Sequence, residues 1–338
     1  MKLDELDAVS MPLPWHEAAF ARVAAEHAAG QLPHALLLQG APGTGKTAFA
    51  LALARLLLCA APRDGRNCGA CHGCELAAAG NNGDLLWVQP DALAPASTTK
   101  KKEERKSRVI RIEQVRAAIA FSHGTAAFGA RQVVVFAPAD SMNVNGYNAL
   151  LKSLEEPAGD TVLLLVCDHM HGVPATIRSR CRLLRLPAPD SATALAWLQA
   201  QAGVETAQAQ PLLEAADGSP VLAARLLQEG QAQDVAGRRL ALRALLQGQA
   251  STTQVWDLWR ECETAEFLQQ LTGEVRAMLR AMPAQRLAGA QGRAAFAILD
   301  EAMNLQRAVS AGANPGKQLL VDGLLAKCHR QLGSTTVG

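Results

Sequence analysis

Apolar residues along the chain follow two patterns, and each pattern predicts a different kind of domain. Over the first half, short runs that are apolar at nearly every position alternate with stretches of helical spacing. The runs are HALLLQ (34–39), DLLWVQP (84–90), VVVFA (133–137) and TVLLLVCD (161–168). Such runs are typical of strands buried on both faces. Strands alternating with helices predict an α/β fold: a mainly parallel sheet with helices on both faces.

After LPAPDS (186–191) the strand pattern ends and helical spacing takes over. Short helices are expected first, with the turn DGSP (217–220) between them, and longer amphipathic helices follow. One predicted helical face carries Val255, Leu258, Trp259 and Cys262. We therefore expect three domains: an α/β domain over 1–188, a small helical lid domain over 189–231, and an all-helical C-terminal domain over 232–338.

GAPGTGKT (40–47) matches the G-x4-G-K-[ST] pattern of a phosphate-binding loop. It lies between a predicted strand and the helical stretch 48–60, the context that such a loop requires. Glycines let backbone amides curl around an anion, and the helix start adds its positive end. The lysine of such a loop reaches the β- and γ-phosphates, and the threonine hydroxyl ligates Mg²⁺. The residues expected to bind ATP or ADP with Mg²⁺ are Gly40, Gly43, Gly45, Lys46 and Thr47.

A carboxylate is missing where hydrolysis needs one. Nucleotide-hydrolysing proteins with this loop end a later strand with an acid that organises Mg²⁺ and water. Here the strand 133–137 ends in Ala137, and Pro138 follows. We expect Asp140, farther along, to be a solvated residue that begins the next turn. The pattern predicts nucleotide binding without intrinsic ATPase activity; a loop that keeps its shape but binds weakly is the alternative.

Four of the eight cysteines lie within sixteen residues, in a C-x8-C-x2-C-x2-C pattern. Tetrahedral Zn²⁺ takes four thiolates, and C-x2-C pairs bring two sulfurs to one ion from a tight turn. Four exposed free thiols this close together are the alternative, but they would be an oxidation hazard. His72 is a possible replacement for one thiolate. A four-cysteine site leaves no position for water, so we predict structural zinc on Cys59, Cys68, Cys71 and Cys74.

Composition excludes some classes of function. The net charge of +2 gives no overall basic field for nucleic acid, and 49% hydrophobic against 19% charged residues excludes wholesale disorder. No run approaches the ~18 apolar residues of a membrane span, and the N-terminus has no apolar signal core. We expect a cytoplasmic protein without membrane contact. The charged segment 94–108 is more typical of a solvated loop than of a DNA contact.

Four stretches together resemble one family. They are HALLLQGAPGTGKTA (34–48), the cysteine cluster (59–74), NALLKSLEEP (148–157) and TIRSRCRLLRL (176–186). The chain is similar to the AAA+ clamp-loader proteins, and among them to the delta-prime subunits of bacterial DNA polymerase III. The likeness covers the first domain nearly end to end, whereas the last hundred residues match only in helical character and length.

The resemblance also favours one type of subunit. The family's ATPase subunits, gamma and tau, carry an Asp-Glu pair where this chain has Ala137 and Pro138. They also carry an arginine shortly after a Gly-Ser pair in the second domain, where Val221 stands here. Both differences indicate the delta-prime type, which the family does not use to hydrolyse ATP.

By the same resemblance, Arg180 of the Ser-Arg-Cys triplet is an arginine finger that reaches the ATP of a neighbouring subunit. Such fingers are worth ~10³–10⁵ in rate. From the residues alone, Arg178, Arg180, Arg182 and Arg185 would be an ordinary basic edge. The implied partners are the gamma or tau ATPase subunits and the delta subunit, joined through a helical collar, with the sliding clamp and primed DNA in the assembled complex.

Two other functions stay open on sequence alone. One is an active gamma-type ATPase in which Asp140 or another carboxylate supplies the missing acid. The other is a zinc-dependent DNA-binding protein that uses the basic part of the 94–108 segment.

Overall fold

The computed structural model describes residues 7–94, 107–128, 131–157, 159–310, 313 and 315–333. The chain divides into two compact units, unit 1 (residues 1–193) and unit 2 (residues 194–338). The division into three domains stays a prediction. Most of the charged segment 94–108 lies outside the described residues, so the expectation for it stays untested.

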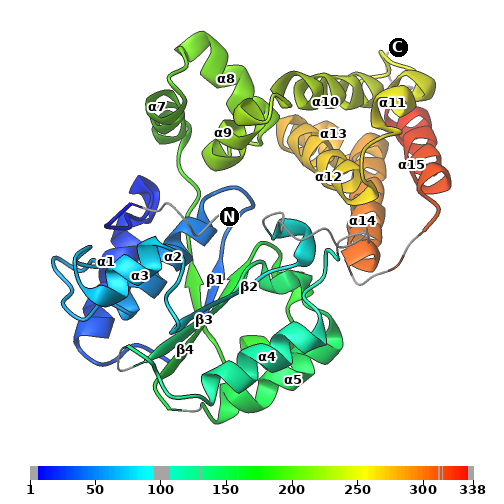
Figure 1. The fold of residues 1–338 in the computed structure, drawn as a ribbon. Coiled ribbons are helices and arrows are strands. Elements are labelled where there is room, and N and C mark those ends of the chain that lie inside the picture. Colours follow the sequence, from blue (N-terminus) through cyan, green and yellow to red (C-terminus); the bar gives the residue numbers. More distant parts are fainter. Residues whose placement is uncertain are drawn as a thin grey trace, which may run out of the picture. The chain divides into compact units, whose positions relative to one another are not determined.

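Among the described residues, unit 1 contains a five-stranded sheet in the order β2-β3-β4-β1-β5 (Figure 1). All neighbouring strands pair in parallel, which confirms the predicted α/β fold. The first four strands are those expected from the apolar runs, and the fifth lies in TIRSRCRLLRL. The strands are β1 (Ala35–Gln39), β2 (Leu85–Val88), β3 (Gln132–Phe136), β4 (Thr161–Cys167) and β5 (Arg182–Arg185).

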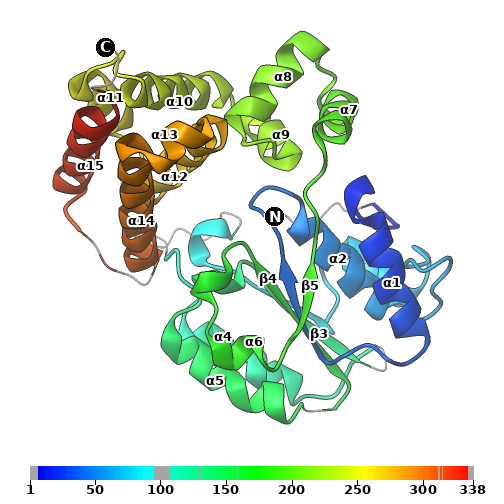
Figure 2. The same cartoon turned by 180° about the vertical axis from the view of Figure 1, so that it is seen from behind.

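Helices cover both faces of this sheet (Figures 1 and 2). Because successive strand side chains point to opposite faces, Leu36 and Leu38 join one core with Phe49 of α2, while Leu37 joins the other with Leu150 of α5. Burial on both faces explains why the runs of the three inner strands, β1, β3 and β4, are apolar, whereas the edge strands β2 and β5 are less buried. The helices are α1 (Glu17–Ala28), α2 (Lys46–Leu57), α3 (His72–Ala78), α4 (Ile112–Ser122), α5 (Val144–Glu155) and α6 (Ala175–Arg178), with 3₁₀ turns at Pro14–His16, Asp91–Leu93, Ala139–Ser141 and Met170–Gly172.

The register between β1 and β4 positions the first candidate site. Gln39, the last residue of β1, pairs with Cys167, the last residue of β4. The two loops that follow, which begin with Gly40 and Asp168, therefore leave the sheet side by side at its carboxyl edge. Ligands of open α/β sheets bind at this edge.

Unit 2 is helical throughout its described residues, as the periodicity predicted. None of the helices that the structure describes has the length and apolar character needed to cross a membrane. The buried apolar residues form two clusters, one around Leu198, Leu213 and Leu226 and the other around Trp259 and Phe267. The helices are α7 (Ser191–Ala202), α8 (Thr206–Ala215), α9 (Pro220–Gln228), α10 (Ala232–Leu246), α11 (Thr252–Trp259), α12 (Thr264–Ala281), α13 (Ala284–Ala288), α14 (Ala290–Ser310) and α15 (Lys317–Leu332).

One expected core position in unit 2 is wrong. Val255, Trp259 and Cys262 are buried as predicted, but the Leu258 side chain is 48% exposed. Since each helical residue advances by about 100°, Leu258 lies about 60° to one side of Val255, while Trp259 lies to the other side. The buried face of this short helix is narrower than its apolar pattern, so Leu258 falls outside it.

Arg239 of α10 is the centre of a buried ionic network in unit 2. This residue is 7% exposed, and its guanidinium donates to Glu274 Oε1 at 2.8 Å and to Asp217 Oδ1 at 2.6 Å. It also donates to the main-chain carbonyl of Glu214, at the end of α8. Glu274 is itself buried and accepts a second hydrogen bond from Arg243 Nε at 3.0 Å. The network joins α8, α10 and α12 through charges that depend on one another.

We expect Arg239→Ala to lower the free energy of unfolding of unit 2 by about 3 kcal/mol. The substitution removes one of the two arginines that pair with the buried Glu274 carboxylate. Urea unfolding followed by circular dichroism would measure the change. Arg225→Ala, at an exposed position on α9, is the matched control and should change stability by less than about 0.5 kcal/mol. Equal effects of the two substitutions would contradict the role of the network.

Candidate functional site

The phosphate-binding loop connects β1 to α2 through two glycines in the left-handed region. Gly43 has φ +71° and Gly45, which caps the amino end of α2, has φ +88°. Both positions favour glycine because L side chains rarely adopt this conformation. Thr44 is buried, donating from Oγ1 to the Ala41 carbonyl at 2.8 Å, while its own carbonyl accepts from Trp15 Nε1 at 2.9 Å. These protein contacts hold the loop in shape.

Lys46, the lysine of this loop, is only 3% exposed. Its Nζ donates to the Ala41 carbonyl at 2.5 Å and forms an ion pair with Asp168 Oδ1. Asp168 was not singled out from the sequence. One signal could have found it: a carboxylate that directly follows a buried strand lies at the carboxyl edge, where ligands of such sheets bind.

The end of β3 carries no acid, as the sequence shows, but the expectation for Asp140 is wrong. The Asp140 side chain is 9% exposed and not solvated. It accepts from the backbone amides of Asp168 at 3.1 Å and His169 at 2.9 Å, and from His169 Nδ1 at 3.2 Å. The 3₁₀ turn Ala139–Ser141 directs this carboxylate toward the loop after β4. Asp140 therefore orders the loop that presents Asp168.

The charges of Asp140 and His169 follow from their contacts. Burial opposes ionisation of Asp140, but the hydrogen bonds from His169 and the backbone amides prevail and lower its pKa. The hydrogen bond to Asp140 in turn raises the pKa of His169 above its ordinary value. The two groups therefore form an ion pair whenever His169 is protonated.

The four predicted zinc ligands converge. The sulfurs of Cys59, Cys68, Cys71 and Cys74 all lie within 4.8 Å of one another. Two separations, Cys59 to Cys71 at 3.9 Å and Cys68 to Cys74 at 4.0 Å, are close to the edge of about 3.8 Å that a tetrahedron with Zn–S bonds of ~2.3 Å requires. These four thiols would hold a tetrahedral Zn²⁺ with no position left for water.

Backbone amides already point at these sulfurs. The amide of Cys68 donates to Cys59 Sγ at 3.2 Å, and that of Cys71 donates to Cys68 Sγ at 3.3 Å. Hydrogen bonds from backbone amides lower the pKa of Cys68 to about 6. Amide donors favour the thiolate form that a metal binds, so the donor set fits zinc.

The segment that holds the four cysteines (residues 59–74, the cysteine module) is tied to the helix that carries Lys46. Arg55 of α2 is buried and donates to the carbonyls of Asp7 and Ala8. Asn67 donates to the same Ala8 carbonyl and to Cys74 Sγ at 3.4 Å. The N-terminal segment therefore lies between α2 and the cysteine module and joins them.

Arg180 is the middle residue of the three-residue connection between α6 and β5 and is partly exposed, at 35% of its side chain. The next residue, Cys181, is buried in the core and anchors the connection. Arg180 Nε donates to Glu155 Oε1 at 2.7 Å, and Nη1 donates to the Thr176 carbonyl at 3.0 Å. Glu155 ends α5, so the NALLKSLEEP and Ser-Arg-Cys motifs meet here, a contact that sequence reasoning missed.

The neighbouring arginines do not form a single basic edge with Arg180. Arg182 makes a two-pronged ion pair with Glu26 of α1, with hydrogen bonds of 2.5 and 2.6 Å. Arg178 and Arg185 line a separate cavity of about 810 Å³. Arg180 and Arg182 therefore each have a carboxylate partner of their own, whereas Arg178 and Arg185 line one cavity together.

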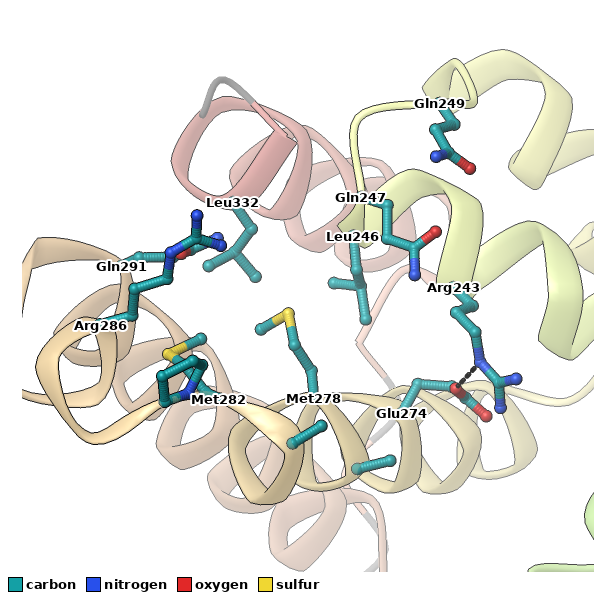
Figure 3. A pocket seen from close by; sticks show the side chains of 13 residues that line it. Arg243, Leu246, Gln247, Gln249, Glu274, Met278, Met282, Arg286, Gln291 and Leu332 are labelled. Atoms are coloured by element: carbon teal, nitrogen blue, oxygen red, sulfur yellow. Dashed lines mark hydrogen bonds and ion pairs between the residues drawn. The ribbon is translucent and has the colours of Figure 1, made fainter. Parts of the chain in front are cut away.

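Unit 2 has a groove of about 670 Å³ between α10, α12, α13 and α15 (Figure 3). Met278 points into it between Leu246 and Leu332, and the ion pair of Arg243 with Glu274 borders it. Glutamines and Arg286 line it together with the apolar side chains, so the groove is of mixed character. It contains none of the residues predicted from the sequence to bind nucleotide or metal.

Comparison with known proteins decides the family. The family model described as "DNA polymerase III, delta subunit" matches residues 15–190, more than half of the chain. A DNA polymerase III subunit delta-prime from Pseudomonas aeruginosa is 38% identical over 249 residues, which cover 73% of this chain and 70% of the relative. The chain belongs to the family of DNA polymerase III delta-prime subunits.

Other members of the delta-prime family are similar over a shorter part. The subunit from Escherichia coli is 33% identical over 215 residues, which cover 64% of this chain and 60% of the relative. The matched span of the family model includes the phosphate loop, the four clustered cysteines and Arg180, whereas all of unit 2 lies beyond it.

A solved structure shares the fold. A gamma subunit-related DNA polymerase III protein from Thermotoga maritima aligns with a TM-score of 0.50 at 16% identity, covering 93% of this chain and 98% of that chain. At this identity the likeness concerns the fold alone, and it agrees with the AAA+ arrangement expected from the sequence. The roles predicted for the loop residues and for Arg180 stay predictions.

We expect the purified chain to contain about one zinc ion, measurable by atomic emission. Cys71→Ser should weaken zinc binding by more than the ~10–100-fold that loss of an outer-shell partner causes. His72→Ala is the control: the four sulfurs form the site without this ring, which packs against Phe128. Loss of zinc from the His72 variant would instead make that imidazole a ligand.

We expect an NMR titration of the His169 ring to show a pKa above the ordinary ~6.5, and Asp140→Asn to bring it down toward that value. Folding raises this pKa, so the pair stabilises unit 1 below about pH 6.5 and loses that contribution as the pH rises through the raised value. His27, whose pKa burial lowers, is the internal control and should not respond. An unchanged His169 pKa in the variant would rule out the pairing.

Proposed function

We propose that this chain acts as the delta-prime-type subunit of the bacterial DNA polymerase III clamp loader. It would help to load the sliding clamp onto primed DNA, together with gamma or tau ATPase subunits and a delta subunit. Its own loop would bind ATP or ADP without efficient hydrolysis, and Arg180 would act on the ATP of a neighbouring subunit. Family membership and the intact Ser-Arg-Cys triplet support this role.

The position of Arg180 relative to the sheet carries the proposal. Leu36 of β1 pairs with Arg182, the first residue of β5, so Arg180, in the turn before β5, lies near the amino end of these strands. The phosphate loop begins at Gly40, at the carboxyl end of β1. At ~3.3 Å per residue, the level of Leu36 and Arg182 is about 13 Å from Gly40 along the strand direction, and Arg180 precedes that level. An arginine so placed would serve the nucleotide of another chain and not its own.

The contacts of Arg180 suit an exchange of its carboxylate partner for a phosphate. The guanidinium is planar and forms two-pronged hydrogen bonds with carboxylates and phosphates alike. In this chain it engages the carboxylate of Glu155 at a partly exposed position. A neighbour's γ-phosphate would replace Glu155, and the positive charge would then offset the charge that develops on the transferred phosphoryl group.

The other sites have supporting roles in this proposal. Zinc on Cys59, Cys68, Cys71 and Cys74 would be structural, since the four sulfurs complete its coordination. The bound metal would fix the segment after α2. The loop residues Gly40, Gly43, Gly45, Lys46 and Thr47 would hold the phosphates, with Mg²⁺ on the Thr47 hydroxyl.

An active ATPase is the second candidate, and one observation favours it. Asp168 is a carboxylate beside Lys46, near the place where a catalytic acid would be needed. Asp140 is a poorer candidate because its oxygens are already engaged by His169 and two backbone amides. ATP turnover by the isolated chain would support this second function.

In a reconstituted clamp loader, we expect Arg180→Ala to reduce ATP turnover stimulated by clamp and primed DNA by at least ~10³-fold at the site it serves. The matched control is Arg182→Ala, which removes an arginine two residues away that is paired with Glu26. Gel filtration would check that both variants assemble. Full turnover with the Arg180 variant in an intact complex would exclude the proposed finger.

A further inference from the structure

The ion pair between Lys46 and Asp168 occupies the group on which the phosphate loop depends. Lys46 is the residue expected to reach the β- and γ-phosphates of a nucleotide. Its Nζ is instead engaged by a carboxylate and a carbonyl of the same chain. Its side chain is nearly inaccessible, whereas the Asp168 side chain is one-third exposed, at 32%. The carboxylate therefore lies between the ammonium group and solvent.

Several independent contacts position this pair, which distinguishes it from a chance surface contact. The register of β1 with β4 places Gly40 and Asp168 at neighbouring starting points. Asp140 then fixes the main chain by accepting from the amides of Asp168 and His169. On the other side, α2 begins at Lys46 directly after Gly45. Both partners are thus held by the sheet and its adjoining elements.

We propose that Asp168 is an internal counter-ion that competes with nucleotide phosphates for Lys46 and so keeps the affinity of this loop low. A phosphate that reaches Lys46 must displace the carboxylate. Asp168 then remains near a group of the same charge, because its main chain is fixed by Asp140. Like charges at short distance in a partly buried site oppose binding. A neutral side chain at position 168 would impose neither penalty.

The opposite role makes the opposite prediction. If Asp168 were a ligand of Mg²⁺ in a nucleotide complex, it would strengthen Mg²⁺-dependent binding, and its removal would weaken that binding. Substitution of Asp168 therefore separates the two roles by the sign of its effect. This inference concerns the isolated chain and does not rest on the role of Arg180.

The test measures binding of fluorescent ATP and ADP analogues, in the presence of Mg²⁺, to the purified full-length chain. Two variants, Asp168→Asn and Asp168→Ala, remove the charge with and without leaving an amide. We expect both to bind about tenfold more tightly than the unchanged chain, a difference of about 1.4 kcal/mol. The gain should shrink as salt is raised, because it is electrostatic.

Two controls accompany these variants. Asp160→Asn removes an acid that precedes the other end of β4, where it pairs with Arg131, and should leave affinity unchanged. Lys46→Ala should abolish the tighter binding when combined with Asp168→Ala. Thermal unfolding would verify that each variant folds.

Three results would overturn the proposal. Weaker binding by both Asp168 variants would make the residue a magnesium ligand. Unchanged binding, including none in any variant, would mean that the ion pair does not control the loop. Tighter binding by Asp168→Asn alone would assign the gain to a new amide contact and not to the removed charge. Loss of function in Arg180 variants would bear on none of these outcomes.

Discussion

The parallel pairing of β1 with β4 is the constraint on which the functional architecture of unit 1 depends. It brings the loop after each strand to the same edge of the sheet. The phosphate loop therefore becomes a neighbour of the turn at Asp168, whose amide donates to Asp140. On the other side of β1, β5 pairs in the same direction. Parallel pairing therefore places Arg180, which precedes β5, at the amino edge, and the loop that follows β1 at the carboxyl edge.

The two basic groups proposed to meet nucleotide phosphates are each engaged by a carboxylate of the same chain. Lys46 pairs with Asp168 and Arg180 pairs with Glu155, and both carboxylates imitate the charge of a phosphate oxygen. The environments differ. The Lys46 ammonium is buried, so exchanging its partner carries an electrostatic penalty, whereas the Arg180 pair is exposed and contributes little in water. The same kind of ion pair is therefore buried at one edge of the sheet and exposed at the other.

The cysteine module shows how a segment with little apolar content acquires a fixed position. Residues 59–74 contain several glycines and polar residues and would gain little from burial. Four convergent thiols would hold a metal ion there, and metal binding would then provide folding free energy. Asn67 and Arg55 extend this order to the N-terminal segment and to α2. The helix that carries Lys46 is therefore supported at its far end by the predicted metal.

The sequence by itself determined the features that depend on local pattern: the buried strands, the glycine loop, the cysteine spacing and the helical character of the second half. Each of these is encoded within a few neighbouring residues. The tertiary structure alone decided which carboxylates meet which bases, since Asp168 and Lys46 are brought together by strand order and Glu155 and Arg180 by the return of α5. It also reversed the expectations for Asp140 and Leu258. The physical reason is that burial and charge pairing depend on what packs against a side chain, and those partners lie far away along the chain.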